Sequence, residues 1–337
     1  MSNDKKTNVV NLYCLGGAGF NAGSELEHFR EHAIGGAAKL NLSYADTSDS
    51  DMSTAIDKEH CYFLPGTKGS GKYQGMNIEV IDQHAKAILQ KFPPSASLNI
   101  LLSSASGGSG APMVSTLASE MLEDGHNVIV IMIGTTADKR EIGNTRNHVR
   151  SAKNVAADTN KPVIAVYLQN TDTTPRIKVN EAIVKLVGSL CVLFSGENHG
   201  LDPQDLYNWL HFNENKTTSY PSRLAQLSMV CGDEKIGQLG NVISVATLAT
   251  PESGHEISQT PEYQVVGRIS PNANKVIIAE APIHFIISTG NFNAVEADME
   301  KRLEELNRQR AAFVEAPTPS APPANTKSTR RGIVVDE

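Results

Sequence analysis

The chain is organised around one glycine-rich segment, Ser103-Ser104-Ala105-Ser106-Gly107-Gly108-Ser109-Gly110-Ala111-Pro112. Before it, the aliphatic residues 98–102 predict a buried strand; after it, Met113, Leu117 and Met121 recur at helical spacing. Glycines let backbone N–H groups approach a phosphate closely, and the first turn of a helix adds its positive end. The stretch therefore predicts a phosphate-binding loop between a strand and a helix, with a flexible turn as the plainer alternative.

A second loop of this kind lies near the start of the chain. Residues 9–15 predict a first strand, which runs into Gly16-Gly17-Ala18-Gly19-Phe20-Asn21, and a helix is expected over residues 21–32. Gly17, Gly19 and Ala22 also fit the G-x-G-x-x-A pattern of dinucleotide sites. An NAD(P)-dependent oxidoreductase is therefore an alternative for this region.

Strands and helices alternate up to residue 170. Further strands are expected over residues 40–45, 61–64, 127–133 and 162–168, with helices over residues 76–91 and up to residue 157. This alternation predicts a mostly parallel, doubly wound α/β sheet, whose ligands bind beyond the carboxyl ends of the strands. Asp46 and Thr47 follow one such strand, although capping of a turn explains them equally well. Lys68 and Lys72 make the glycine-rich loop 65–72 basic enough to contact a terminal phosphate.

The second half of the chain changes character. Residues 179–194 predict a long buried helix with Asn180 near its start, and Asp202 caps a further helix that begins at Pro203. For Asp202 and Asp205, the residues alone favour a role in charge stabilisation at the start of that helix. Residues 215–290 predict a smaller α+β domain, residues 292–313 a charged helix, and residues 316–328 a disordered linker.

Composition excludes several classes of protein. The 337 residues carry a net charge of −7, which does not suggest bulk binding to nucleic acids or anionic membranes. Four scattered cysteines indicate neither a zinc site nor a disulfide framework. The first eight residues contain no apolar segment, so no signal peptide is visible, and a cytoplasmic protein is expected.

The order of these motifs resembles the tubulin/FtsZ superfamily of GTPases. Ser106 to Gly110 is similar to its glycine-rich signature, and the segment from Asn198 to Asp205 is similar to the loop that enters the site of the neighbouring subunit. By this resemblance, the candidate nucleotide-binding residues are Gly16, Gly17, Ala18, Gly19, Asn21, Asp46, Thr47, Gly69, Gly71, Ser106, Gly107, Gly108, Ser109, Gly110, Glu141, Asn144, Asn170 and Asn180. Asn170 and Asn180 match positions that contact the guanine base.

The resemblance implies a tubulin/FtsZ-like α/β fold with a Rossmann-like GTP-binding domain over residues 1–178 and a central helix over residues 179–197. The loop and following helix at 198–214, an α+β domain at 215–290, a helix at 291–315 and a flexible tail at 316–337 complete the chain. The implied ligands are GTP or GDP, with Mg²⁺ held through the phosphates and no direct metal ligand from the protein.

The same resemblance implies head-to-tail polymerisation, in which Asp202 and Asp205 of one subunit act on the nucleotide of the next. The tail, which ends in Gly332 to Glu337, would dock on the neighbouring subunit. Within the superfamily the bacteriophage tubulins are most similar, so the filament is expected to position phage DNA or replication material in the host bacterial cytoplasm, with no membrane or direct nucleic-acid partner. The alternatives are the oxidoreductase and a non-catalytic nucleotide-binding scaffold.

Overall fold

A computed structural model describes residues 8–31, 35–216, 218–232, 239–253, 260–273, 280–315, 327–328 and 334–335. Two short strands, β11 (Lys327–Ser328) and β12 (Val334–Val335), pair in the C-terminal part. The rest of the expected tail, including most of the peptide from Gly332 to Glu337, lies outside the described residues, as does His32 at the end of the first expected helix.

One ten-stranded sheet forms the centre of the molecule, in the order β3-β2-β1-β4-β5-β6-β7-β10-β8-β9. The strands are β1 (Val9–Leu15), β2 (Lys39–Asp46), β3 (Cys61–Phe63), β4 (Leu98–Ser104), β5 (Val128–Gly134), β6 (Val163–Gln169), β7 (Leu224–Cys231), β8 (Val242–Ala249), β9 (Tyr263–Arg268) and β10 (Ile283–Ser288). From β3 to β7 all neighbours are parallel, whereas β10 is antiparallel to both β7 and β8. The predicted parallel sheet is confirmed, and the strands of the later region extend it through β7.

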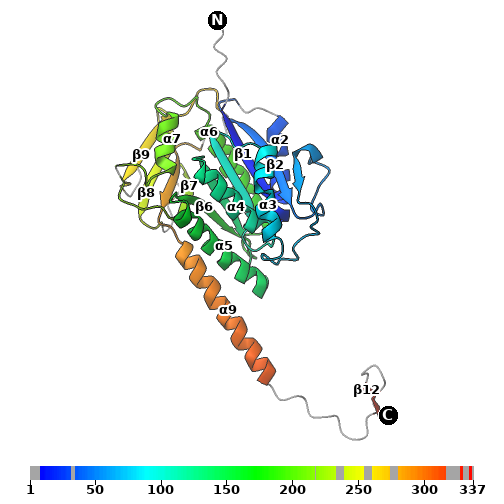
Figure 1. The fold of residues 1–337 in the computed structure, drawn as a ribbon. Helices are drawn as coiled ribbons and strands as arrows, with labels where there is room; N and C mark the ends of the chain where they lie inside the picture. Colours follow the sequence, from blue (N-terminus) through cyan, green and yellow to red (C-terminus); the bar gives the residue numbers. More distant parts are fainter. Residues whose placement is uncertain are drawn as a thin grey trace.

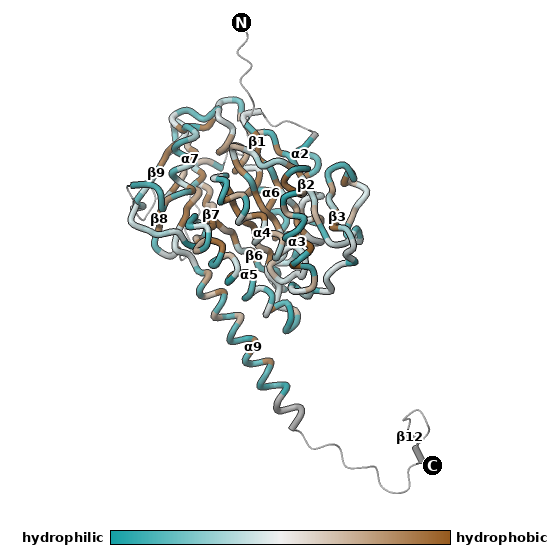
Figure 2. Tube along the Cα trace, viewed as in Figure 1, coloured by the Kyte–Doolittle hydropathy of each residue, from teal (hydrophilic) through white to brown (hydrophobic). Residues whose placement is uncertain are grey.

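Helices cover both faces of this sheet (Figure 1). They are α1 (Gly16–Ser24), α2 (Glu27–Glu31), α3 (Ile78–Lys91), α4 (Gly110–Glu123), α5 (Lys139–Asp158), α6 (Arg176–Leu193), α7 (Pro203–Leu210) and α9 (Phe292–Glu315), with a short 3₁₀ helix at Lys58–His60. Alternation along β1 shows the two faces: Leu12 packs in the core that contains α6, and Tyr13 packs in the core that contains α3, α4 and α5. The apolar residues therefore gather along the sheet in the interior (Figure 2).

The first helix differs from its prediction. It was expected from residue 21, after a glycine turn, but α1 begins at Gly16, directly after the extended residue Leu15. Gly16 has a φ of +70°, which lets the chain turn from strand to helix without a connecting loop. The glycines predicted as a turn are therefore the first turns of the helix, and the helical segment breaks after Ser24 before α2.

Helix α9 leaves the body of the protein (Figure 1). Its first half packs on α5: Glu296 pairs with Arg150 and lies 2.6 Å from Lys153 Nζ. Met299 is buried, whereas Leu303 and Leu306 are only half-buried. Within the described residues, no helix is both long and apolar enough to cross a membrane.

Candidate functional site

A cavity of about 490 Å³ opens at the carboxyl edge of the parallel strands. Its walls come from the ends of β1, β2, β4, β5 and β6 and from the loops and helices that follow them. All but two of the predicted nucleotide-binding residues line it, and the two exceptions are Gly19 and Asn144. Loops that are far apart in the sequence therefore converge on one site, as the topology of an open α/β sheet requires.

Two helices begin at this cavity without side-chain caps. Neither Leu15 at the start of α1 nor Ser109 at the start of α4 caps its helix through a side chain. The two starts lie close together, because a Cβ added at Gly16 would lie 2.9 Å from the backbone nitrogen of Gly110, and one at Gly110 would lie 2.4 Å from the carbonyl oxygen of Leu15. Free N–H groups and two positive helix ends therefore face one volume, which suits an anion such as a phosphate chain.

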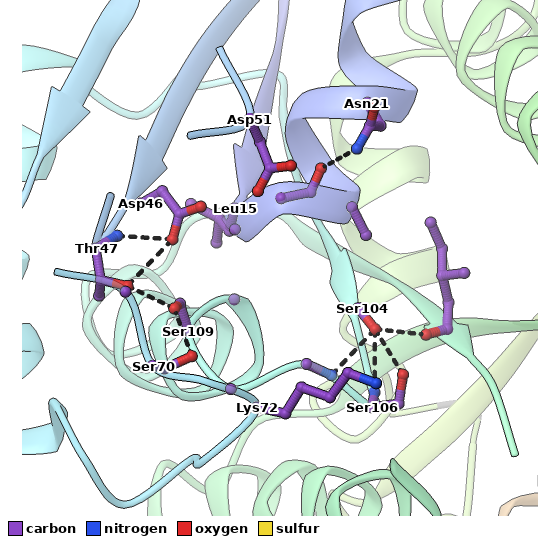
Figure 3. A pocket seen from close by; sticks show the side chains of 18 of the residues that line it. Leu15, Asn21, Asp46, Thr47, Asp51, Ser70, Lys72, Ser104, Ser106 and Ser109 are labelled. Atoms are coloured by element: carbon purple, nitrogen blue, oxygen red, sulfur yellow. Dashed lines mark hydrogen bonds between the residues drawn. The ribbon is translucent and has the colours of Figure 1, made fainter. Parts of the chain in front are cut away.

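Hydroxyl groups form a second feature of the cavity (Figure 3). Thr47 Oγ1 lies 2.6 Å from Ser109 Oγ, which donates to Ser70 Oγ at 3.0 Å. On the other side, Ser104 Oγ accepts hydrogen bonds from the backbone nitrogens of Ser106 and Gly107, at 3.2 and 3.1 Å. These bonds hold the glycine-rich loop and the end of β2 in fixed positions around the cavity.

Two carboxyl groups stand beside the anion-binding backbone (Figure 3). Asp46 is 4% exposed, and burial raises its pKa to about 6; hydrogen bonding from Thr47 lowers the pKa, and the nearby charge of Asp51 raises it. Asp51 lies against Gly17, where an added Cβ would be 2.2 Å from Asp51 Oδ2. Carboxylate and hydroxyl oxygens are the donors that Mg²⁺ prefers. Among the described residues there is no group of three His, Cys, Asp or Glu side chains that could hold a metal alone.

Lys72 crosses the rim of the cavity to the start of α5. Its Nζ lies 2.5 Å from Glu141 Oε1 and 3.1 Å from Asp138 Oδ2. Hydrogen bonds to these carboxylates raise the pKa of Lys72 and keep it charged. Glu141 is buried, and the ion pair places one positive charge and one carboxylate side by side at the cavity.

Gly19 and Asn144 serve the site indirectly. A Cβ at Gly19 would lie 2.7 Å from the carbonyl carbon of Cys14, so the absence of a side chain lets α1 pack on β1. Asn144 Nδ2 donates to the carbonyl oxygens of Lys72 and Ser106, at 2.8 and 2.9 Å. Asn144 therefore joins the loop of Lys72 to the loop of Ser106 without lining the cavity itself.

Three asparagines line the part of the cavity next to α1 and α6. Asn21 Nδ2 donates to the carbonyl oxygen of Gly17 at 2.8 Å, and Asn180 Nδ2 donates to Glu25 Oε1 at 2.5 Å. Asn170 Oδ1 is buried and has no hydrogen-bond partner. An unsatisfied buried acceptor is costly, so this wall is suited to a ligand that carries hydrogen-bond donors.

Lys72, which was expected to contact a terminal phosphate, lines the cavity. The cavity also contains residues that the sequence interpretation did not assign to the site: Leu15, Ser48, Ser50, Asp51, Ser70, Ser104, Ile133, Thr135 and Arg176. Most of them belong to loops already predicted to contact the ligand. Arg176 is the first residue of α6, after β6, and its position at the same sheet edge is the signal that could have identified it.

Asp202 and Asp205 do not line this cavity. Asp202 Oδ1 accepts from the backbone nitrogen of Asp205 at 2.9 Å, and Asp205 Oδ2 accepts from that of Asp202 at 3.1 Å, which makes a reciprocal cap on α7. Asp202 borders a second cavity together with Asn8, Ser97 and Asn127, the residues directly before β1, β4 and β5. The pair is therefore at the amino edge of the strands, opposite the first cavity.

Comparisons with known proteins agree with this architecture. The family model "Phage tubulin-like protein, C-terminal domain" matches residues 201–290. A phage tubulin-like protein of Pseudomonas phage phiKZ is 27% identical over 339 residues, covering 96% of this chain and 98% of that protein.

Solved structures are similar over nearly the whole chain. A TubZ protofilament from bacteriophage PhiKZ has a TM-score of 0.80 at 25% identity, and the phage tubulin PhuZ in its GDP form has a TM-score of 0.82 at 20% identity. Each similarity covers 97% of this chain and 99% of the solved chain. The chain therefore has a tubulin/FtsZ-like α/β fold and is similar to phage tubulin-like proteins over nearly its whole length.

Proposed function

We propose that this protein binds and hydrolyses GTP and polymerises head to tail, so that Asp202 and Asp205 of one subunit complete the active site of the next. The observation that carries the proposal is the placement of the two halves of the site. The anion-binding cavity is at the carboxyl edge of the sheet, and the acid pair is at the amino edge. One copy cannot bring them together, whereas a head-to-tail repeat can.

The cavity accounts for nucleotide binding in the proposal. Backbone N–H groups at the starts of α1 and α4 would bind the phosphates, and the asparagine wall would bind the base. Asp46 and Asp51 fit a Mg²⁺ ion held mainly by the phosphates, since they offer oxygen donors beside the anion site. A bound Mg²⁺ would supply charge neutralisation for the phosphate oxygens.

Hydrolysis requires a positioned water. Its oxygen forms a bond to the γ-phosphorus while the bond from that phosphorus to the β–γ bridging oxygen breaks, which gives GDP and phosphate. In the proposal, the carboxylates of Asp202 and Asp205 orient this water through hydrogen bonds, and one of them accepts the proton that the water loses as it attacks. Phosphoryl transfer depends mainly on positioning and charge stabilisation, so a site divided between subunits is chemically sufficient.

Exposed apolar side chains support a contact at the cavity rim. The large hydrophobic residues that are exposed among the described residues are Tyr73, Met76, Ile78 and Ile177, at 45% to 63% exposure. They belong to two segments whose members Lys72 and Arg176 line the cavity. A neighbouring subunit that covered this rim would remove apolar surface from water. The C-terminal peptide would add a second, tethered contact.

The proposed cellular role is based on similar proteins from bacteriophages. The solved relatives include a TubZ protofilament from a bacteriophage. On that basis we propose that the filament acts in the cytoplasm of an infected bacterium and positions phage DNA or replication material, without binding a membrane or the nucleic acid directly.

The test measures phosphate release from GTP over a range of protein concentrations, with right-angle light scattering recorded in parallel. We expect the rate per subunit to rise steeply above the concentration at which scattering appears. A constant rate per subunit without scattering would disprove the shared site.

The two alternatives are distinguished by combining this assay with binding measurements for GTP and NAD(P). Nucleotide binding and assembly without phosphate release would indicate a non-catalytic scaffold. Tight binding of NAD(P) without any response to GTP would indicate an oxidoreductase.

A further inference from the structure

The amide of Asn180 is held by a residue outside the predicted site. Asn180 lies in the second turn of α6, lines the cavity and is 4% exposed. Its Nδ2 donates to Oε1 of Glu25 at 2.5 Å. Glu25 is the residue directly after α1, so this bond joins the end of the first helix to the start of the central helix.

This hydrogen bond determines which way the amide points. A carboxylate only accepts hydrogen bonds, whereas an asparagine amide donates through nitrogen and accepts through oxygen. Rotation of the amide by 180° would bring its oxygen against the Glu25 carboxylate and lose the bond. Glu25 therefore keeps Nδ2 on its own side and leaves Oδ1 as the polar atom that Asn180 can offer to a ligand.

The two neighbouring asparagines also have amide oxygens that can accept hydrogen bonds. The nitrogen of Asn21 is engaged by the carbonyl oxygen of Gly17, and the oxygen of Asn170 is buried without a partner. The amide oxygens of these asparagines are therefore available as acceptors on this wall. A purine whose edge carries donors is favoured there, and a purine that carries an acceptor at the same place is disfavoured.

Guanine and adenine differ in this respect. The N1 and N2 positions of guanine carry hydrogens and donate, whereas N1 of adenine is an acceptor and C2 bears no amino group. We infer that Glu25 is a positioning residue for guanine selectivity, because it fixes the Asn180 oxygen as the acceptor that guanine requires. This inference rests on the proposed function and adds the source of its base preference.

The experiment uses the full chain below its assembly concentration and measures affinities for GDP and ADP by competition with a fluorescent GDP analogue. In Glu25→Ala the amide can rotate, so we expect GDP binding to weaken about tenfold while ADP binding is unchanged, as for loss of one oriented hydrogen bond. Glu25→Gln can accept from Asn180 Nδ2 or donate to its Oδ1, so it holds the amide without fixing its direction, and GDP affinity should lie between those of the wild type and Glu25→Ala.

Two further variants separate positioning from folding. Glu27→Ala removes a carboxylate from the same segment that bonds Tyr44 and Arg30 instead, and it should leave the ratio of GDP to ADP affinity unchanged. Asn180→Asp should weaken GDP binding by opposing two carboxylates, and adding Glu25→Gln to it should recover the preference, because the introduced amide donates to the aspartate.

The outcomes distinguish the two proposals. Equal losses of GDP and ADP affinity in Glu25→Ala, or no loss of either, would overturn the role of Glu25. A wild-type chain that binds GDP and ADP equally would instead overturn the proposed guanine-nucleotide function before any variant is compared.

Discussion

The helices at the two edges of the sheet begin in opposite ways. At the carboxyl edge, α1 and α4 begin without side-chain caps, and their glycines bring the free N–H groups together. At the amino edge, α7 begins at Pro203 with a reciprocal cap from Asp202 and Asp205. The positive end of a helix is thus left available for an anion at one edge, and is satisfied by the protein's own carboxylates at the other. The first arrangement is suited to an anionic ligand, and the second holds two acids in a fixed orientation at the surface.

The largest effect is expected from variants that keep the cap on α7 but remove its negative charge. Asp202→Asn and Asp205→Asn retain an oxygen that accepts the capping hydrogen bond, so the melting temperature should stay nearly constant. Phosphate release above the assembly concentration should nevertheless fall on the order of 1000-fold in each, if the carboxylates act on water.

The control for this pair is Asp57→Asn, because Asp57 caps the 3₁₀ helix in the same way, with Oδ1 2.9 Å from the nitrogen of Glu59. Its turnover should match the wild type. Unchanged turnover in Asp202→Asn and Asp205→Asn as well would reduce the acid pair to a structural cap.

The next effect concerns the buried carboxyl group of Asp46 and the pH dependence of stability. Burial raises the pKa of Asp46 from 3.8 to about 6, so the folded protein keeps a proton that the unfolded chain has lost between these values. In the nucleotide-free protein, the contribution of Asp46 to the free energy of unfolding should therefore fall by about 3 kcal/mol as pH rises from 4 to above 6.

Comparison of Asp46→Asn with the wild type isolates this contribution. Buried His148, whose pKa is lowered to about 4 by burial, changes stability in the opposite sense over the same range, but it is present in both proteins. Urea unfolding from pH 4 to 7.5 should show Asp46→Asn gaining on the wild type with rising pH, while exposed Asp49→Asn does not. Parallel curves for the wild type and Asp46→Asn would contradict the assignment.

Adding a side chain at Gly108, where two cavity loops approach closely, should remove most of the affinity for nucleotide. A Cβ at Gly108 would lie 2.3 Å from Ser70 Oγ and 2.7 Å from the backbone nitrogen of Tyr73, so the loop that carries Lys72 must move. Gly108→Ala should weaken GDP binding about 100-fold, equivalent to two hydrogen bonds to a charged ligand. Gly143→Ala in α5, where a Cβ meets nothing within 4 Å, is the matched control and should bind GDP normally. Equal affinity in the two variants would show that the loop tolerates displacement.

The smallest effect tests whether the rim is covered in a filament. Met76 is 61% exposed, so Met76→Ser should leave monomer stability unchanged. It should raise the concentration at which scattering begins about fivefold, because about 1 kcal/mol of apolar burial is lost at the contact. Met76→Leu preserves the apolar surface and should assemble like the wild type. An unchanged threshold in Met76→Ser would place the subunit contact away from this rim.

The sequence predicted the candidate site well where loops follow strands. Asp46, Thr47 and Asn170 were identified because the carboxyl ends of parallel strands meet at one edge, and all three line the cavity. Asp51 and Glu25 were not assigned to the site, because a charged residue in a polar segment has no local signal for the group that it faces. Asn144 was assigned to the site by the resemblance, but its amide donates to the carbonyl oxygens of Lys72 and Ser106 and does not line the cavity.

Local sequence by itself determined the strands, most of the helices and the cap on α7, because periodic apolar residues, glycine and Asp-Pro act within a few residues. It also determined that a glycine-rich segment follows each of two strands. Only the tertiary structure decided that the starts of α1 and α4 meet, that Glu25 reaches Asn180, and that Asp202 and Asp205 lie at the edge opposite the cavity. These relations join residues far apart in the chain, and they depend on strand order and on how the helices pack across the sheet.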